Sequence, residues 1–186
     1  LYLSAVSAGP LHSDKRTDHL VYDRGVANKG DTPQLIALPD GSEVTLEPRS
    51  RVRFDSDFAG EERRVYLSGK AFFKVVRDER RPFKVITREV ITEVLGTSFS
   101  VSAFRWDNSV KISVVRGKVS VYTKEEIRQK AKGDAEVILT PNQEFIYNRE
   151  EQKISKTIVK EPKAIIPPEE VKRMRFEETT PKVLFG

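Results

Sequence analysis

The chain has 186 residues but contains no cysteine, only one methionine and one tryptophan, and two histidines. The absence of cysteine excludes disulfide frameworks, thiolate nucleophiles, and cysteine-ligated zinc or iron–sulfur sites. His12 and His19 both lie near the N-terminus, so a histidine metal site or a Ser-His-Asp triad would depend on that segment. No run approaches the ~20 apolar residues that a membrane-spanning helix needs. The short apolar start, residues 1–6, fits the end of a membrane helix, a first strand or a disordered end.

Motifs for nucleotide binding and nucleophilic catalysis are also missing. The sequence has no Gly-x-Gly-x-x-Gly, no phosphate-binding Gly-x-x-x-x-Gly-Lys-Ser/Thr and no Gly-x-Ser-x-Gly elbow. Asp55 and Asp57 form a carboxylate pair of the kind used by glycosidases or by calcium sites, although aspartate is equally common in turns. We therefore expect no enzyme, no metal site and no cofactor.

The net charge of +5 comes from mixed clusters of both signs, such as residues 61–64 and 78–81. A nucleic-acid surface requires segregated Lys and Arg interleaved with aromatic residues or glycines. Mixed clusters instead indicate a solvated surface with internal ion pairs. We expect no nucleic-acid partner.

From Gln34 onward the sequence consists of short alternating runs. Phe99, Val101 and Ala103, for example, alternate with three serines. Roughly ten or more such runs, with turn residues every ~8–12 positions, predict an all-β fold. We expect an antiparallel two-sheet β-sandwich or β-roll. One or two short helices are predicted as well: residues 123–132, where Thr123 and Glu126 have capping-box spacing, and a segment after Pro168.

Four glycines are predicted to occupy structural turns: Gly41, Gly69, Gly96 and Gly117. Pro39-Asp40-Gly41 separates two alternating runs, as expected for a tight hairpin. The spacing of the first three glycines is nearly even, which is compatible with solenoid-like stacking of β layers. The simpler alternative is that hairpins commonly begin with glycine.

The aromatic residues Phe104, Trp106 and Tyr122 allow two interpretations. They could form an exposed platform for a sugar ring, or they could pack at the edge of the core. A carbohydrate-binding or adhesion module is therefore the alternative to the function considered next.

Six strings, read in order over about residues 34–159, resemble motifs of the FecR protein family. They are residues 38–42, 64–75, 81–85, 94–99, 115–121 and 139–144. The resemblance, closest to Bacteroidetes members, implies the extracytoplasmic domain of an anti-sigma regulator. Such regulators cross the inner membrane once, and their periplasmic part senses the signalling domain of a TonB-dependent outer-membrane transporter. A cytoplasmic segment, absent from this chain, controls an extracytoplasmic-function (ECF) sigma factor.

The resemblance also suggests how the chain is organised. Residues 1–30 are expected to be a stalk after a missing membrane helix, and residues 31–160 the FecR-type β domain. Residues 161–186 are expected to be a linker and the truncated start of a small α/β domain. We expect the partner to bind by pairing with a free sheet edge or through Phe176, Glu177, Thr180 and Pro181.

Overall fold

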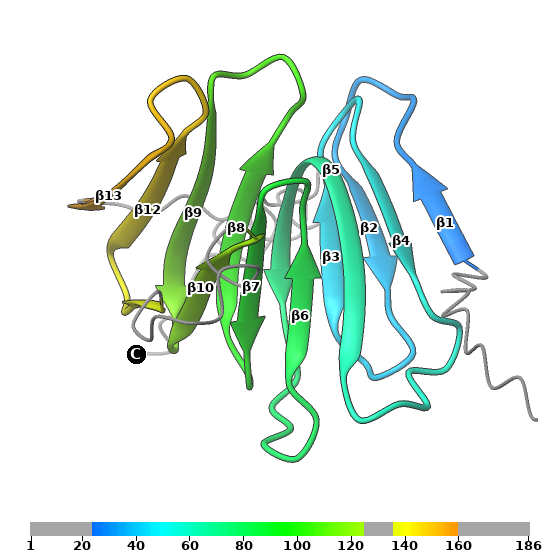
Figure 1. Ribbon diagram of the computed structural model, residues 1–186. Coiled ribbons are helices and arrows are strands. Elements are labelled where there is room, and N and C mark those ends of the chain that lie inside the picture. The colour runs from blue at the N-terminus through cyan, green and yellow to red at the C-terminus, as the bar shows by residue number, and fades with distance from the viewer. Residues whose placement is uncertain (1–23, 125–135, 160–186) are drawn as a thin grey trace, which may run out of the picture.

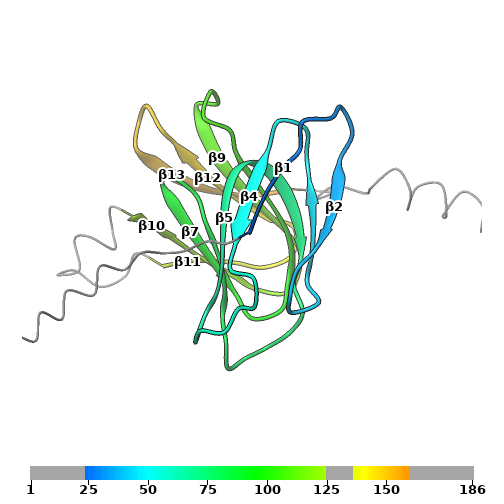
Figure 2. The ribbon, with the colours of Figure 1, turned by 90° about the vertical axis from the view of Figure 1, so that its right-hand side faces the viewer.

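The computed structural model describes residues 24–124 and 136–159, and every regular element in these segments is a β-strand. The 13 strands form one continuous sheet, which curls into a half-barrel (Figures 1 and 2). The predicted all-β class is therefore confirmed.

The curled sheet has two layers that share the long strand β5 (Arg63–Lys74). The first layer has the order β1-β4-β5-β6-β7-β10-β11 and contains β1 (Arg24–Ala27), β4 (Arg51–Phe54), β6 (Phe83–Ile86), β7 (Val90–Val94), β10 (Val119–Thr123) and β11 (Val137–Leu139). The second has the order β2-β3-β5-β8-β9-β12-β13 and contains β2 (Gln34–Ala37), β3 (Glu43–Leu46), β8 (Ser98–Ala103), β9 (Ser109–Arg116), β12 (Gln143–Asn148) and β13 (Lys153–Ile158).

Strand β5 passes from one layer to the other at Gly69. Residues before Gly69 pair with β4 and β6, whereas Gly69 and the residues after it pair with β8, and Ala71 onward also with β3. Gly69 has a φ of +107°, and an added Cβ would lie 2.6 Å from Ser50 Cβ. Gly69, predicted to occupy a turn, instead lies inside strand β5, because a glycine can bend a continuous strand as well as form a turn.

The sheet is mixed, because β5 and β6 pair in parallel while all other pairs among the described strands are antiparallel. The predicted antiparallel pairing therefore holds for every described pair except this one. Strand β5 curls so far that the chain after it returns beside its first residue: Arg63 N–H donates to Pro82 O at 2.9 Å. Strand β6 therefore starts beside the start of β5 and runs in the same direction.

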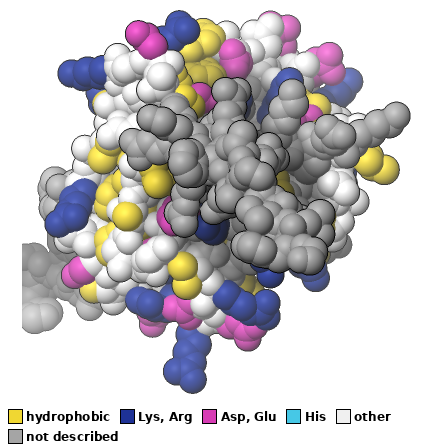
Figure 3. Space-filling view, turned by 180° about the vertical axis from the view of Figure 1, so that it is seen from behind, with side chains coloured by type: hydrophobic (Ala, Val, Ile, Leu, Met, Phe, Trp, Pro, Cys, Tyr) yellow, Lys and Arg dark blue, Asp and Glu magenta, His cyan; other side chains and the backbone are white. Residues whose placement is uncertain are grey.

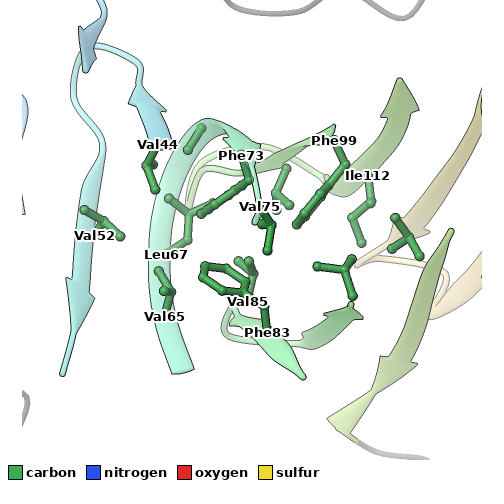
Figure 4. Close-up of a cluster of buried hydrophobic side chains, with 14 of the residues drawn as sticks. Val44, Val52, Val65, Leu67, Phe73, Val75, Phe83, Val85, Phe99 and Ile112 are labelled. Atoms are coloured by element: carbon green, nitrogen blue, oxygen red, sulfur yellow. The ribbon is translucent and has the colours of Figure 1, made fainter. Parts of the chain in front are cut away.

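A single apolar core lies between the layers (Figure 4). Phe73 links them, because its ring centroid lies 5.2 Å from that of Phe99 in β8 and 6.2 Å from that of Phe83 in β6. Along β8 the apolar residues are buried and the serines half-buried, as the alternation predicts. The core is thus built from valine and phenylalanine at alternate strand positions.

Some expectations fall at or beyond the limits of the described residues. Strand β1 begins at Arg24, within the segment 1–30 predicted as a stalk. The predicted helix over 123–132 lies outside the described residues after Lys124, as does the segment after Pro168. In the part of the chain that the structure describes, no helix has the length and apolar character needed to cross a bilayer.

Candidate partner-binding surfaces

The structure locates the four glycines but not the predicted C-terminal binding residues. Gly41 lies in the β2–β3 turn, Gly96 between β7 and β8, and Gly117 between β9 and β10. Phe176, Glu177, Thr180 and Pro181 lie outside the described residues. Their role therefore stays a prediction.

A buried ion pair connects the β2–β3 turn to the start of β5. Arg63 is fully buried, and its Nη1 lies 2.7 Å from Asp40 Oδ2. The same nitrogen donates to Val76 O at 2.9 Å, and Nε donates to Arg81 O at 2.9 Å. Arg63 belongs to the mixed cluster of residues 61–64 that the sequence predicts to lie on the surface. The signal that could have identified it is strand alternation, because Arg63 shares the inward face of β5 with Val65 and Leu67.

Asp40 also organises its own turn. Its Oδ1 accepts a hydrogen bond from Ser42 N at 3.0 Å, and its Oδ2 accepts one from the Ser42 hydroxyl at 2.7 Å. Ser42 Oγ in turn accepts from Val76 N at 3.0 Å. This network has a structural role, since it holds the turn and both ends of β5 together.

A groove of about 840 Å³ lies where the first layer meets the turns of the second. Eight of the 17 described residues that line it are Lys or Arg, and none of these 17 is Asp or Glu. One side carries Lys29, Arg49, Arg51 and Arg53, from β4 and the loops beside it. The other cations are Arg88, Arg105, Lys124 and Arg149. Tyr66 and Ile86, which are half-buried, add apolar surface. No sequence motif indicates this groove, because its cations are distant from one another in sequence.

The cations of the groove differ in how firmly they are held. Arg149 lies 3.0 Å from Glu89 Oε1 through Nε, and its Nη1 donates to Phe104 O at 2.6 Å and to Asp107 O. Lys29, Arg49, Arg51 and Arg105 are exposed and make no ion pair within residues 24–124 and 136–159. Four cations of the groove therefore have no carboxylate partner among the described residues.

An exposed tryptophan stands beside this groove in the β8–β9 turn. Trp106 follows Arg105 and is 64% exposed. Its ring stacks on Phe104 with centroids 4.7 Å apart and an interplanar angle of 21°. Tyr122 lies apart in sequence on β10 and is half-buried. The structure thus stacks two of the three aromatics considered for sugar binding, leaving one face of Trp106 outward.

An ion-pair network lies on the outer face of the first layer. Lys84 Nζ contacts Glu62 and lies 3.3 Å from Glu93 Oε2. Burial alone would raise the pKa of Glu62, but hydrogen bonds from Lys84 and Arg64 outweigh it and lower the pKa. Burial alone would lower the pKa of Lys84, but Glu62 and Glu93 outweigh it and raise the pKa. Both groups are therefore held in their charged forms, which suits a structural network.

The carboxylate pair considered for catalysis or calcium lies in the β4–β5 loop. Asp57 is exposed, and its Oδ1 accepts a hydrogen bond from Ala59 N at 3.0 Å, as in an Asx turn. Asp55 is half-buried and has its own interactions. Over the described residues no group of three or more His, Cys, Asp or Glu side chains could hold a metal ion.

The layers end in edge strands that could recruit a partner strand. These edges are β1 and β11 in the first layer and β2 and β13 in the second. Exposed apolar side chains lie at three of them: Leu35 on β2 is 50% exposed, Ile138 on β11 is 44% exposed and Ile158 on β13 is 77% exposed. Seen from behind, side chains of both charge signs are interspersed around the rim of the molecule (Figure 3). The charged residues among the described lining of the groove, in contrast, are all positive.

Fold and surface together define an all-β domain with candidate surfaces for binding a partner. Residues 29–120 match the family model described as FecR protein. The chain belongs to the FecR protein family. The predicted family is therefore confirmed.

Two crystal structures, at 2.50 Å and 1.65 Å resolution, of a candidate anti-sigma factor from Parabacteroides distasonis ATCC 8503 resemble this chain. Each is 33% identical in sequence, with a TM-score of 0.67 and coverage of 73% of this chain. The match spans only 60% of the length of the solved protein. No curated protein matches the sequence.

Proposed function

We propose that this chain is the periplasmic sensor and relay domain of an anti-sigma regulator anchored in the inner membrane. The observation that carries the proposal is the FecR match over residues 29–120, supported by the 33% identity to a candidate anti-sigma factor. The domain would transmit the state of a TonB-dependent outer-membrane transporter to an ECF sigma factor by protein–protein contacts.

The described residues suit a relay that works by binding. The motifs of the family correspond to turns, alternating strands and a buried ion pair, all of which build a scaffold. Edge strands and the basic groove provide surfaces to which another protein can bind. The proposal assigns no catalytic step and no cofactor to the domain.

The direct test is calorimetric titration of the chain with the N-terminal signalling domain of the transporter encoded beside its gene. Saturable binding is expected, and the signalling domain of an unrelated transporter serves as the control. Equal binding of both domains, or of neither, would contradict the proposed partner. Repeating the titration without residues 160–186 separates binding by the C-terminal segment from binding by the β domain.

Carbohydrate binding is the second candidate, because Trp106 presents an aromatic ring that is 64% exposed. Sugar rings stack on such surfaces, but the opposite face of this ring is taken up by Phe104. Calorimetry against a glycan panel tests this function, with Trp106→Ala as the matched variant. Affinity that disappears in the variant would support a glycan-binding module. Absence of binding to every glycan in the panel would contradict this function.

A further inference from the structure

The basic groove has the chemistry of a site for carboxylates. Six of its eight cations are arginines, whose planar guanidinium groups pair with carboxylates through two parallel hydrogen bonds. Lys29, Arg49, Arg51 and Arg105 are exposed and make no ion pair within the described part of the chain. Unlike the mixed charges elsewhere, these cations have no counter-charge among the residues that the structure describes. The groove therefore attracts an external anion.

The shape and lining of the groove favour a peptide over a flat anionic surface. Its cations come from separate segments of the chain that line one hollow of about 840 Å³, whereas a lipid surface would contact only the rim. Tyr66 and Ile86 give the same groove apolar surface. In an extended peptide, alternate side chains point to opposite faces, so acidic and apolar residues could each meet their own part of the groove.

Trp106 offers an anchoring residue in the same turn as Arg105. It directly follows Arg105, which lines the groove, and its ring is held in place by Phe104. Exposed tryptophan and arginine are the side chains that most often dominate binding energy at interfaces. The β8–β9 turn thus combines an exposed aromatic ring with the exposed positive charge of Arg105.

We propose that this groove binds an acidic, extended segment of a protein partner, with carboxylates on Arg49, Arg51 and Arg105. The inference rests on the proposed relay function, because it names the surface by which the domain would engage that partner.

The test uses a fluorescent peptide of alternating glutamate and leucine, and the same peptide with glutamine in place of glutamate. Fluorescence anisotropy compares the full chain with Arg49→Gln/Arg51→Gln/Arg105→Gln. The control Lys111→Gln/Arg116→Gln/Lys118→Gln removes three exposed cations outside the groove, so both variants lose the same charge. Circular dichroism verifies that each variant is folded.

We expect the acidic peptide to bind and the groove variant to bind about tenfold more weakly, since three exposed ion pairs are lost. The control variant should keep its affinity within about twofold, and added salt should weaken binding. Equal loss in both variants, or equal binding of the glutamine peptide, would overturn the inference. Binding to phosphatidylglycerol vesicles without binding to the peptide would overturn it in favour of a membrane surface.

Titration of the same variants with the transporter signalling domain separates this inference from the proposed function. If that domain binds the wild type and the groove variant equally, the relay function stands and the groove is not its docking site. If the acidic peptide binds through the groove but the signalling domain does not bind at all, the groove stands and the proposed partner is wrong.

Discussion

Arg63 and Asp40 are joined by a salt bridge of 2.7 Å, and their side chains are only 1% and 6% exposed. The pair lies where the β2–β3 turn, the start of β5 and the chain after β5 meet. Above the guanidinium, the ring of Phe83 lies 5.4 Å from its central carbon. One ion pair thus connects three segments that are distant in sequence.

Removing one member of this pair leaves the other charge buried without its partner. We expect Arg63→Met to lower the free energy of unfolding by about 3–5 kcal/mol, measured by urea denaturation. The control Arg64→Met removes a neighbouring side chain that is 40% exposed, and it should cost less than about 1 kcal/mol. Similar decreases in the free energy of unfolding in the two variants would show that the buried pair stabilises the fold no more than an exposed arginine does. The double variant Arg63→Met/Asp40→Asn should cost less than the sum of its single changes.

Gly69 is expected to be intolerant of any side chain. Its φ of +107° disfavours other residues, and an added Cβ would lie 2.7 Å from the Cα of Ser50, which cannot move without the backbone. Gly69→Ala should therefore lower the free energy of unfolding by more than about 2 kcal/mol. Thermal denaturation provides the measurement. In Gly60→Ala the nearest atom would lie at 3.8 Å, so this control should stay within about 0.5 kcal/mol of wild type.

The ion pairs of Glu62 predict how stability depends on pH. The folded pKa of Glu62 lies below its ordinary value of 4.5, so its ionised form stabilises the fold above that pH. This contribution should disappear as the pH falls through the lowered pKa. Glu62→Gln should cost less than about 1 kcal/mol at neutral pH, because the pair is partly exposed. The difference from wild type should vanish in acid, as followed by urea denaturation at several pH values.

Glu61→Gln is the matched control for that series, because Glu61 is exposed and its substitution removes the same negative charge as Glu62→Gln. A difference between wild type and Glu62→Gln that persisted unchanged into strong acid would contradict the assignment of this ion pair.

Trp106 is the only tryptophan, so intrinsic fluorescence reports on the β8–β9 turn alone. Because its side chain is 64% exposed, its emission should resemble that of indole in water and be quenched by iodide. Trp106→Ala should change the free energy of unfolding by less than about 1 kcal/mol, since little buried surface is lost. Protection from iodide on adding the transporter signalling domain would place this turn in the interface. Unchanged quenching in the bound complex would place the interface elsewhere.

The burial of side chains within a single strand can be predicted from neighbouring residues in the sequence. The alternation of Phe99, Val101 and Ala103 with serines predicts both the strand β8 and its buried face. The same rule, applied to β5, would have predicted that Arg63 points inward with Val65. Its burial was missed because its sequence neighbours, Glu61, Glu62 and Arg64, are charged residues typical of a surface.

The basic groove could not be predicted in the same way. Lys29, Arg51, Arg105 and Arg149 belong to four separate segments, and each lies in a stretch of ordinary mixed charge. Only the curling of the sheet brings them to one hollow. The parallel pair of β5 and β6 has the same origin, because it requires the end of β5 to return beside its start.

By itself the sequence determined the all-β class, the alternating core and the membership of the FecR family, because these properties depend on residue order over short distances. The tertiary structure decided where β5 bends, which strands pair in parallel, which arginine is buried and which cations share a groove. These properties depend on contacts between distant segments, and such contacts exist only once Gly69 has let β5 cross from one layer to the other.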